Sequence, residues 1–258
     1  MALACRELST PCVIVLPSTA PQTKIEATRG YGAEIVHHDL LGEGREAATE
    51  RLARERGLTI IPPFDHPDII AGQGTAAAEL FEDYGPLDLL LVPVGGGGLI
   101  SGSALATRAC VSDVSRRRGR ARGRRRRRAL VPRRHAREHR SPDTIADGAR
   151  TTSLGAITFE LIRRYVADMT TVPDAALIEA MAFVWTRLKI VVEPTGVLGL
   201  AALLSGRVRA NGERVGVIVS GGNVDLASAR AWLAPAEQRA LASQCPEQPA
   251  GPVPGRGR

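Results

Sequence analysis

Short apolar runs alternate with longer amphipathic stretches along most of the chain. The short runs are rich in β-branched residues and end at Gly or Pro, which is typical of strands, whereas the longer stretches have helical periodicity. This pattern predicts strands at residues 12–16, 33–36, 58–61, 87–94 and 214–219. It predicts helices at 21–29, 44–56, 69–84, 100–110, 155–164, 173–189 and 196–205, and from 224 onward. Such alternation indicates an α/β fold with open, mostly parallel sheets and flanking helices.

One stretch breaks this pattern. Residues 116–140 hold 14 arginines and one acid, Glu138, a local charge of +13; subtracting it from the net charge of +7 leaves −6 for the remainder. The basic character therefore belongs to one segment and indicates little about the fold. Because the segment has no alternating apolar face, we expect residues 116–140 to be exposed and to form no strand of the central sheet. The Pro- and Gly-rich tail, residues 241–258, is predicted to be disordered.

Composition excludes several classes of protein. No apolar run approaches the roughly 20 residues of a membrane span, and no signal-peptide pattern follows Met1, so we expect a cytoplasmic protein without a membrane partner. The histidines His37 and His38 point to opposite faces of a strand, which favours a solvated strand end over a metal site. Four scattered cysteines are expected to be reduced thiols, with neither a metal nor a disulfide framework: Cys5, Cys12, Cys110 and Cys245.

The sharpest motif is a run of four glycines, Gly95, Gly96, Gly97 and Gly98, followed by Leu99. It lies between a predicted buried strand and a predicted helix. Glycines here let several backbone N–H groups converge on one point, and the helix N-terminus adds partial positive charge. We therefore favour a phosphate-binding loop. The alternative is a tight turn that needs glycine only for packing.

Two further motifs follow apolar runs. Ser220-Gly221-Gly222-Asn223 comes directly after the last predicted strand, and ligands of parallel sheets collect at the carboxyl ends of strands. We therefore predict that this loop and Gly95–Gly98 face one cleft, with the Ser220 side chain pointing into it. Glu193, which begins the sequence Glu-Pro-Thr-Gly, could equally be a helix-terminus ligand for backbone N–H groups. Spacing alone favours structural turns at residues 72–75 and 144–148.

In order, these motifs resemble the fold-type-II pyridoxal-phosphate-dependent family of threonine and serine dehydratases, which includes serine racemase. The resemblance covers nearly all of residues 2–110 and 142–233, and it implies a tryptophan synthase β-like α/β fold that is incomplete at the N-terminus. It rests on six stretches: CVIVLPSTAPQTKIEATRGYGAEIV, PPFDHPDIIAGQGTAAAEL, LLLVPVGGGGLISGSALA, PDTIADGAR, VVEPTGVLGLAALLSG and VGVIVSGGN.

The resemblance implies a role for each matching residue. The amides of Gly95–Gly98 and Leu99 would hold the phosphate of pyridoxal 5′-phosphate. Ser220 would hydrogen-bond the pyridine nitrogen, and Glu193 would lie near the cofactor ring. The implied reaction is loss of water from threonine or serine, followed by hydrolysis of the enamine to a 2-oxo acid and ammonia. The family likeness also implies a small amino-acid substrate and, for an intact enzyme, a homo-oligomer.

The chain departs from the family pattern in two places. Its first residues match the middle of a family helix, so we expect the segment with the cofactor-binding lysine to be missing and no catalytic residue to be present. Residues 1–68 would then be a remnant of the smaller domain and 69–240 the larger cofactor-binding domain. Residues 111–141 interrupt the larger domain, and we hypothesise that two compensating frame changes bound them. This segment replaces a family strand together with the divalent-metal ligands of the racemase-like members.

Two alternative functions stay open at this stage. Within the family, the chain could be a serine racemase-like enzyme. From another class, it could be a non-catalytic protein that uses residues 116–140 as an arm for nucleic acid or another partner. The arm lacks aromatic residues for stacking and contains no lysine, which argues against nucleic acid.

The resemblance predicts that the purified chain does not turn over threonine or serine. The chemistry needs a lysine to hold the cofactor and to move the Cα proton. The chain contains only Lys24 and Lys189, and both match non-catalytic positions on helices. Borohydride reduction of the cofactor-loaded protein, followed by peptide mapping, should therefore find no pyridoxyl-lysine. A pyridoxyl group on either lysine, together with steady 2-oxo acid production, would contradict the prediction.

Overall fold

The computed structural model of the chain describes residues 1–38, 44–117, 128–132 and 143–242. Nine α-helices occur in these ranges: α1 (Ala2–Glu7), α2 (Gln22–Gly30), α3 (Arg45–Arg56), α4 (Pro67–Tyr84), α5 (Gly98–Arg117), α6 (Ala156–Tyr165), α7 (Asp174–Phe183), α8 (Leu198–Leu204) and α9 (Leu226–Ala242). The described strands are β1 (Val13–Pro17), β2 (Glu34–His38), β3 (Leu89–Leu91), β4 (Arg128–Pro132), β5 (Asp168–Thr170) and β6 (Val215–Val217). Short helical segments are η1 (Asp147–Ala149), the π-helical η2 (Val184–Leu188) and η3 (Pro194–Val197).

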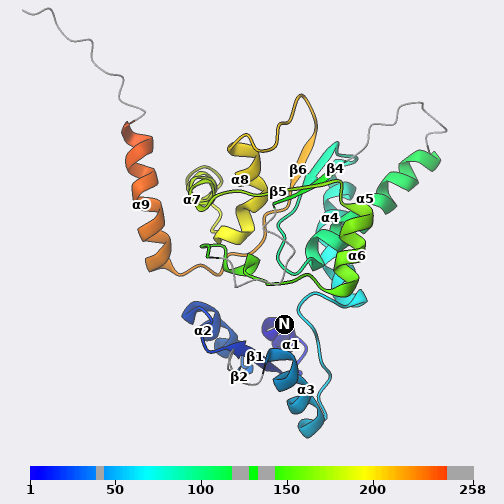
Figure 1. The fold of residues 1–258 in the computed structure, drawn as a ribbon, viewed down its shortest axis with the longest axis vertical. Helices are drawn as coiled ribbons and strands as arrows, with labels where there is room; N and C mark the ends of the chain where they lie inside the picture. The colour runs from blue at the N-terminus through cyan, green and yellow to red at the C-terminus, as the bar shows by residue number, and fades with distance from the viewer. Residues whose placement is uncertain (39–43, 118–127, 133–142, 243–258) are drawn as a thin grey trace, which may run out of the picture.

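The first 56 residues form a small body, which we call the N-terminal unit (Figure 1). Its two strands, β1 and β2, pair in parallel from Val13↔Glu34 to Pro17↔His38, and α2 connects them. His38, expected at a solvated strand end, is only 6% exposed. Burial on this side of β2 therefore extends to the last residue of the strand.

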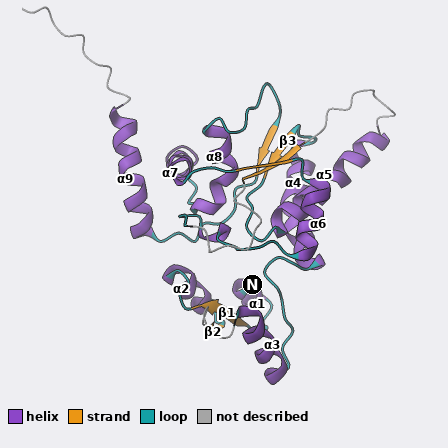
Figure 2. Ribbon diagram, viewed as in Figure 1, coloured by secondary structure: helices purple, strands orange, loops and turns teal. Residues whose placement is uncertain are grey.

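Residues 67–242 form the large unit around a parallel sheet with the strand order β5-β4-β3-β6. Side chains of β3 alternate between two cores, as expected for a strand that is covered on both faces. Leu90 packs in a cluster with Ala77 of α4 and Ile162 of α6, whereas Leu91 packs with Ala202 of α8. Figure 2 shows helices on both sides of these strands. The predicted fold, open parallel sheets with flanking helices, is confirmed.

The strand predicted at residues 58–61 is wrong. This segment has no regular secondary structure and belongs to an extended connection between the two units (Figure 1). Leu58, Ile60 and Ile61 are 37%, 42% and 49% exposed. An apolar run predicts a strand only where a neighbouring strand can pair with it, and the described residues provide none here.

The prediction that residues 116–140 contribute no strand is also wrong. β4 lies between β3 and β5, with Leu89 opposite Arg128 and Leu130 opposite Asp168. The prediction averaged composition over 25 residues, but parallel pairing uses backbone groups and needs only a few residues with a short apolar run, here Ala-Leu-Val. The frame-change hypothesis rested on the Arg-rich composition of the segment and stays a prediction. Residues 116–117 lie at the end of α5 and residues 241–242 at the end of α9, so helix replaces the first two residues of the tail that was predicted to be disordered; apart from β4, the other positions of both predictions lie outside the described residues.

Residues 72–75, predicted as a turn, lie inside α4. Gly74 is buried where α4 crosses α5, and a Cβ at Gly74 would lie 2.8 Å from the carbonyl oxygen of Gly102. Gly74 and Gly102 therefore allow α4 and α5 to approach each other closely. Within the described residues, no helix combines the length and apolar character needed to cross a bilayer.

We predict that Gly102→Ala destabilises the protein by about 1–3 kcal/mol, the usual cost of overpacking. Its Cβ would lie 2.6 Å from the backbone nitrogen of Gly74. Gly72→Ala in α4 is the matched control, because a Cβ at Gly72 meets no atom within 4 Å. Alanine should favour that helix by up to about 1 kcal/mol. Urea unfolding of both variants tests the prediction, and equal unfolding midpoints would contradict it.

Candidate functional site

Both glycine-rich loops leave the large sheet at the same edge. β3 and β6 are adjacent and parallel, with Leu89 opposite Val215 and Leu91 opposite Val217. Gly95–Gly98 follows β3, and Ser220–Asn223 follows β6. The two loops thus occupy the carboxyl edge of neighbouring strands, where parallel sheets bind ligands. The direction of the Ser220 side chain stays a prediction.

Two further segments meet these loops at van der Waals distance. A Cβ at Gly95 would overlap the carbonyl oxygen of Gly148, and one at Gly196 would overlap that of Ser220. A Cβ at Gly221, whose φ is +72°, would lie 2.5 Å from Oε1 of Glu193. Residues 144–148 and Glu193–Gly196 therefore belong to the same site as the glycine loops. The first of these segments was predicted only as a structural turn.

The four-glycine loop is tightly packed. A Cβ would overlap the Phe64 ring at Gly96, and at Gly97 and Gly98 it would lie 2.8 Å from Thr158 and 2.9 Å from Gln73. Gly97 also has a φ of +98°, which side chains rarely adopt. Packing alone would therefore require glycine here, as the alternative interpretation held.

The backbone N–H groups of this loop are nevertheless unpaired. Among the described residues, no group accepts a hydrogen bond from the amides of residues 95–100. They stand at the N-terminus of α5, which begins at Gly98 and whose peptide dipoles add partial positive charge. Consecutive free amides at a helix N-terminus are suited to bind a phosphate or another anion. Packing and anion binding are thus compatible uses of the same glycines.

Three residues outside the predicted site support the loop. Asp65 accepts hydrogen bonds from the amides of Ala156, Ile157 and Thr158 at 2.9, 3.0 and 3.0 Å, and so caps α6. The Thr158 hydroxyl in turn donates to the carbonyl oxygen of Gly96 at 2.9 Å. Together with the Phe64 ring, these contacts join the connection between the units to the glycine loop. The sequence did not predict this cap, because Asp65 lies 91 residues before Ala156 and forms no recognisable motif with α6.

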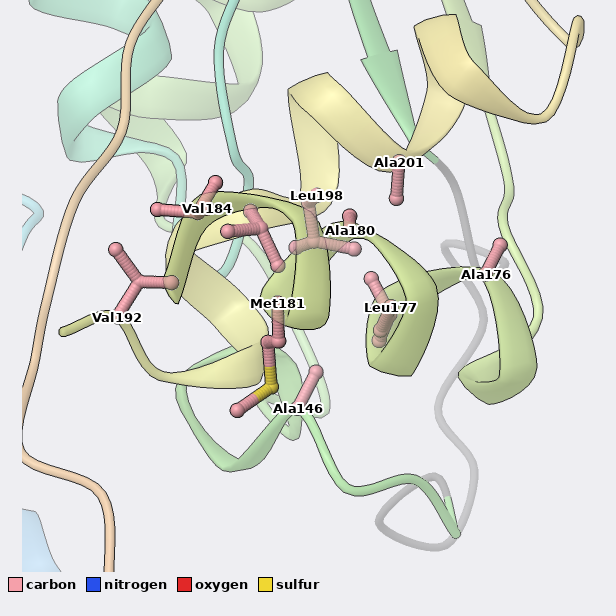
Figure 3. Close-up of a cluster of buried hydrophobic side chains, with 10 residues drawn as sticks. Ala146, Ala176, Leu177, Ala180, Met181, Val184, Val192, Leu198 and Ala201 are labelled. Carbon is pink, nitrogen blue, oxygen red and sulfur yellow. The ribbon is translucent and has the colours of Figure 1, made fainter. Parts of the chain in front are cut away.

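A hydrophobic cluster positions two acids beside the loops. Ala146 and Val192, 2% and 1% exposed, pack in one core with residues of α7 and α8 (Figure 3). Each directly precedes an acid, Asp147 or Glu193. The indole nitrogen of Trp185 also donates to the carbonyl oxygen of Val192 at 3.1 Å. Core packing therefore fixes the backbone from which both carboxylates project.

Lys24 reaches these acids from the N-terminal unit. Its Nζ lies 2.6 Å from Oδ2 of Asp147 and 3.6 Å from Oε2 of Glu193. Lys24, which matched a non-catalytic position on a helix, thus contacts two acids of the candidate site. Burial raises the pKa of Glu193 above its ordinary value; the Lys24 cation lowers this pKa, and the charge of Asp147 raises it. The site thus contains a carboxyl group that can hold a proton more readily than an exposed glutamate.

We predict that Asp65→Ala lowers the free energy of unfolding by about 1–2 kcal/mol, because three helix-terminal amides lose their acceptor. The variant should also bind pyridoxal phosphate more weakly, since the Thr158–Gly96 contact loses its support. Asp68→Ala is the control, because the Asp68 side chain is 91% exposed. Thermal unfolding and cofactor titration measure both effects. The same loss in the two variants would show that Asp65 is an ordinary surface acid.

Comparisons with known proteins agree with this arrangement. A family model described as "Pyridoxal-phosphate dependent enzyme" matches residues 1–221. The chain is 49% identical to L-threo-3-hydroxyaspartate ammonia-lyase from Pseudomonas sp., over 88% of this chain and 71% of that protein. It is 45% identical to the serine racemase of Schizosaccharomyces pombe, over 88% of this chain and 70% of that protein.

A solved structure has the same fold. Maize serine racemase superposes with a TM-score of 0.76 at 34% sequence identity, over 94% of this chain and 74% of that one. The family predicted from the six sequence stretches is confirmed, and with it the cofactor of the family, pyridoxal phosphate. This chain therefore belongs to the fold-type-II family of pyridoxal-phosphate-dependent enzymes, whose members resembling it here include ammonia-lyases and racemases.

Proposed function

We propose that this chain provides the cofactor-binding part of an ammonia-lyase that eliminates water from a small β-hydroxy amino acid. The observation that carries the proposal is the row of unpaired amides at residues 95–100, at the sheet edge that also holds Glu193 and Ser220. The named relatives act on 3-hydroxyaspartate and serine. These amino acids share a β-hydroxyl group with threonine, the substrate that the sequence motifs suggest.

The residues at this edge fit pyridoxal phosphate. The amides of Gly95–Gly98 and Leu99 would hold its phosphate, and glycine leaves this backbone accessible. Ser220, whose own amide donates to the carbonyl oxygen of Gly196 at 3.2 Å, would offer a hydroxyl to the ring nitrogen. Glu193 would lie beside the ring. When bound, the cofactor supplies an electron sink for ionisation of the substrate Cα–H bond.

A neutral hydroxyl at Ser220 favours elimination over reactions that need a stronger electron sink. Unlike a carboxylate, it does not keep the ring nitrogen protonated. A substrate with a β-hydroxyl leaving group needs less electron withdrawal by the cofactor ring, because the departing hydroxyl takes the electrons that the Cα–H bond releases. The packed Glu193–Gly196 and Ser220–Asn223 turns hold the backbone from which both side chains project.

We further propose that the 258-residue chain binds the cofactor without a covalent link. Lys24 is engaged with Asp147 and Glu193, and Lys189 is exposed at the end of η2. Lys24 is therefore occupied by the two acids, and Lys189 matches a non-catalytic position of the family. We therefore expect the chain to bind the cofactor weakly and reversibly. We also expect it to release 2-oxo acid no faster than free cofactor does.

Racemisation is the second candidate, because serine racemases are among the similar proteins. The two functions differ in their need for a β-hydroxyl group. If the site is built for elimination, the absorbance of the bound cofactor should change more with 3-hydroxyaspartate than with aspartate. It should likewise change more with serine than with alanine. Equal responses within each pair would contradict the dehydratase proposal. Formation of the D-amino acid, without 2-oxo acid, would favour the racemase.

The phosphate site gives a test that does not depend on turnover. We predict that pyridoxal phosphate binds at least about tenfold more tightly than pyridoxal, since charge-assisted contacts to the amides contribute more than about 1.4 kcal/mol. Gly97→Ala should weaken binding of the phosphate form only, because alanine strains a φ of +98°. Fluorescence titration measures both ligands. Equal affinities of the wild-type protein for the two ligands would contradict a phosphate-binding role for this loop.

A further inference from the structure

We propose that Lys24 is a positioning residue that reaches across from the N-terminal unit, fixes the Glu193 carboxylate beside the glycine loops, and holds the two units together at the cofactor site. Its role in catalysis rests on the proposed function, whereas its geometry does not. The side chain belongs to α2, more than 100 residues away in sequence from both of its partners. It links α2 directly, through charge, to this edge of the large sheet.

The three side chains form a partly buried cluster. Lys24, Asp147 and Glu193 are 30%, 22% and 12% exposed, so water screens their charges less than it screens a surface pair. The contacts at 2.6 and 3.6 Å leave one cation between two carboxylates. Removing the cation would leave two acids facing each other in partial burial, which is costly. The cluster therefore favours a conformation in which α2 contacts the large unit.

Hydrogen bonds hold the backbone turns that carry both acids, whereas the lysine reaches the acids from the other unit. Oδ1 of Asp147 accepts from the amide of Gly148 at 2.8 Å, and this amide also donates to the hydroxyl of Thr195 at 3.0 Å. Glu193 donates its backbone N–H to the carbonyl oxygen of Gly221 at 3.1 Å. The turns carrying Asp147 and Glu193 are thus joined to each other and to the Ser220–Asn223 loop. A movement of the N-terminal unit would therefore shift the Lys24 cation relative to the turns that carry Asp147 and Glu193.

The charges acting on Glu193 give opposite expectations for two substitutions. Among the described residues, the ionisable groups that act on it are Lys24 from α2 and Asp147 from η1, and the adjoining Gly221 loop contributes no charge. Burial has already raised the pKa of Glu193, and Lys24 opposes that effect. Loss of the cation should therefore raise the pKa of Glu193 further. Loss of the Asp147 charge should lower it, because repulsion disappears and Lys24 can approach more closely.

The test measures the titration of the Glu193 carboxyl by carbon-13 NMR, with the signal assigned by its loss in Glu193→Gln. The titration midpoint should move to higher pH in Lys24→Met, move to lower pH in Asp147→Asn, and stay near the wild-type value in Lys24→Arg. Lys189→Met is the matched control, because Lys189 is exposed on the large unit, and it should leave the midpoint unchanged. Shifts of the same sign in Lys24→Met and Asp147→Asn would overturn the proposal.

Reaction with an amine-selective acylating reagent tests the link between the units without cofactor. The chain has two lysines, so peptide mapping separates them. Lys24 should react about fivefold more slowly than Lys189, the protection expected from a partly buried ion pair, and Asp147→Asn should speed its reaction. Equal rates in the wild-type protein would show that Lys24 does not hold the units together.

Cofactor binding then connects the cluster to function. Lys24→Met should weaken pyridoxal phosphate binding by about fivefold or more, and Lys24→Arg should restore it. If the NMR shifts occur but all variants bind the cofactor like wild type, the positioning role is wrong. If the wild-type protein binds no cofactor, the proposed function fails, whereas the NMR and labelling results still decide whether Lys24 fixes Glu193 and joins the units.

Discussion

Close backbone approach at the carboxyl edge of the large sheet is the constraint on which the candidate site depends. Gly95 meets Gly148, Gly196 meets Ser220, and Gly221 meets Glu193, each at a separation that leaves no space for a Cβ atom. The first two pairs touch through backbone, Gly221 lies against the Glu193 side chain, and the Glu193 amide also donates to the carbonyl oxygen of Gly221, so the relative positions of these segments have little freedom. The amides of the site, and the backbone that carries Ser220 and Glu193, are therefore placed by close packing.

Local sequence predicted most elements of the fold. Alternating patterns located β1, β2, β3 and β6 and the helices around them, because each of these elements carries its own periodicity. The pattern missed β4 and also β5, which is three residues long and partly exposed, and it placed a strand at residues 58–61, where the described residues offer no partner strand. Short strands are stabilised mainly by their neighbours in the sheet, so a window of local residues contains little information about them.

The candidate site was predictable where glycine supplied a signal and unpredictable where distance in sequence separated the partners. Gly95–Gly98 and Ser220–Asn223 follow strands that pair in the sheet, so one rule about parallel sheets located both. Lys24, Asp65 and Thr158 act through partners 62–169 residues away, and their local surroundings resemble ordinary helix and loop sequence. Only the tertiary structure shows that these polar residues converge on the glycine loops.

The connection between the two units also has a consequence for the exchange of parts among relatives. Phe64 and Asp65 precede the large unit, yet they contact Gly96 and cap α6 inside it. The end of the connection is thus a component of the large unit rather than a spacer. A chimera that combines an N-terminal unit from one relative with this large unit would need its junction before Phe64, in the exposed stretch at residues 58–61. With a junction only a few residues later, Phe64 and Asp65 would come from a different protein than the glycine loop and the helix that they contact.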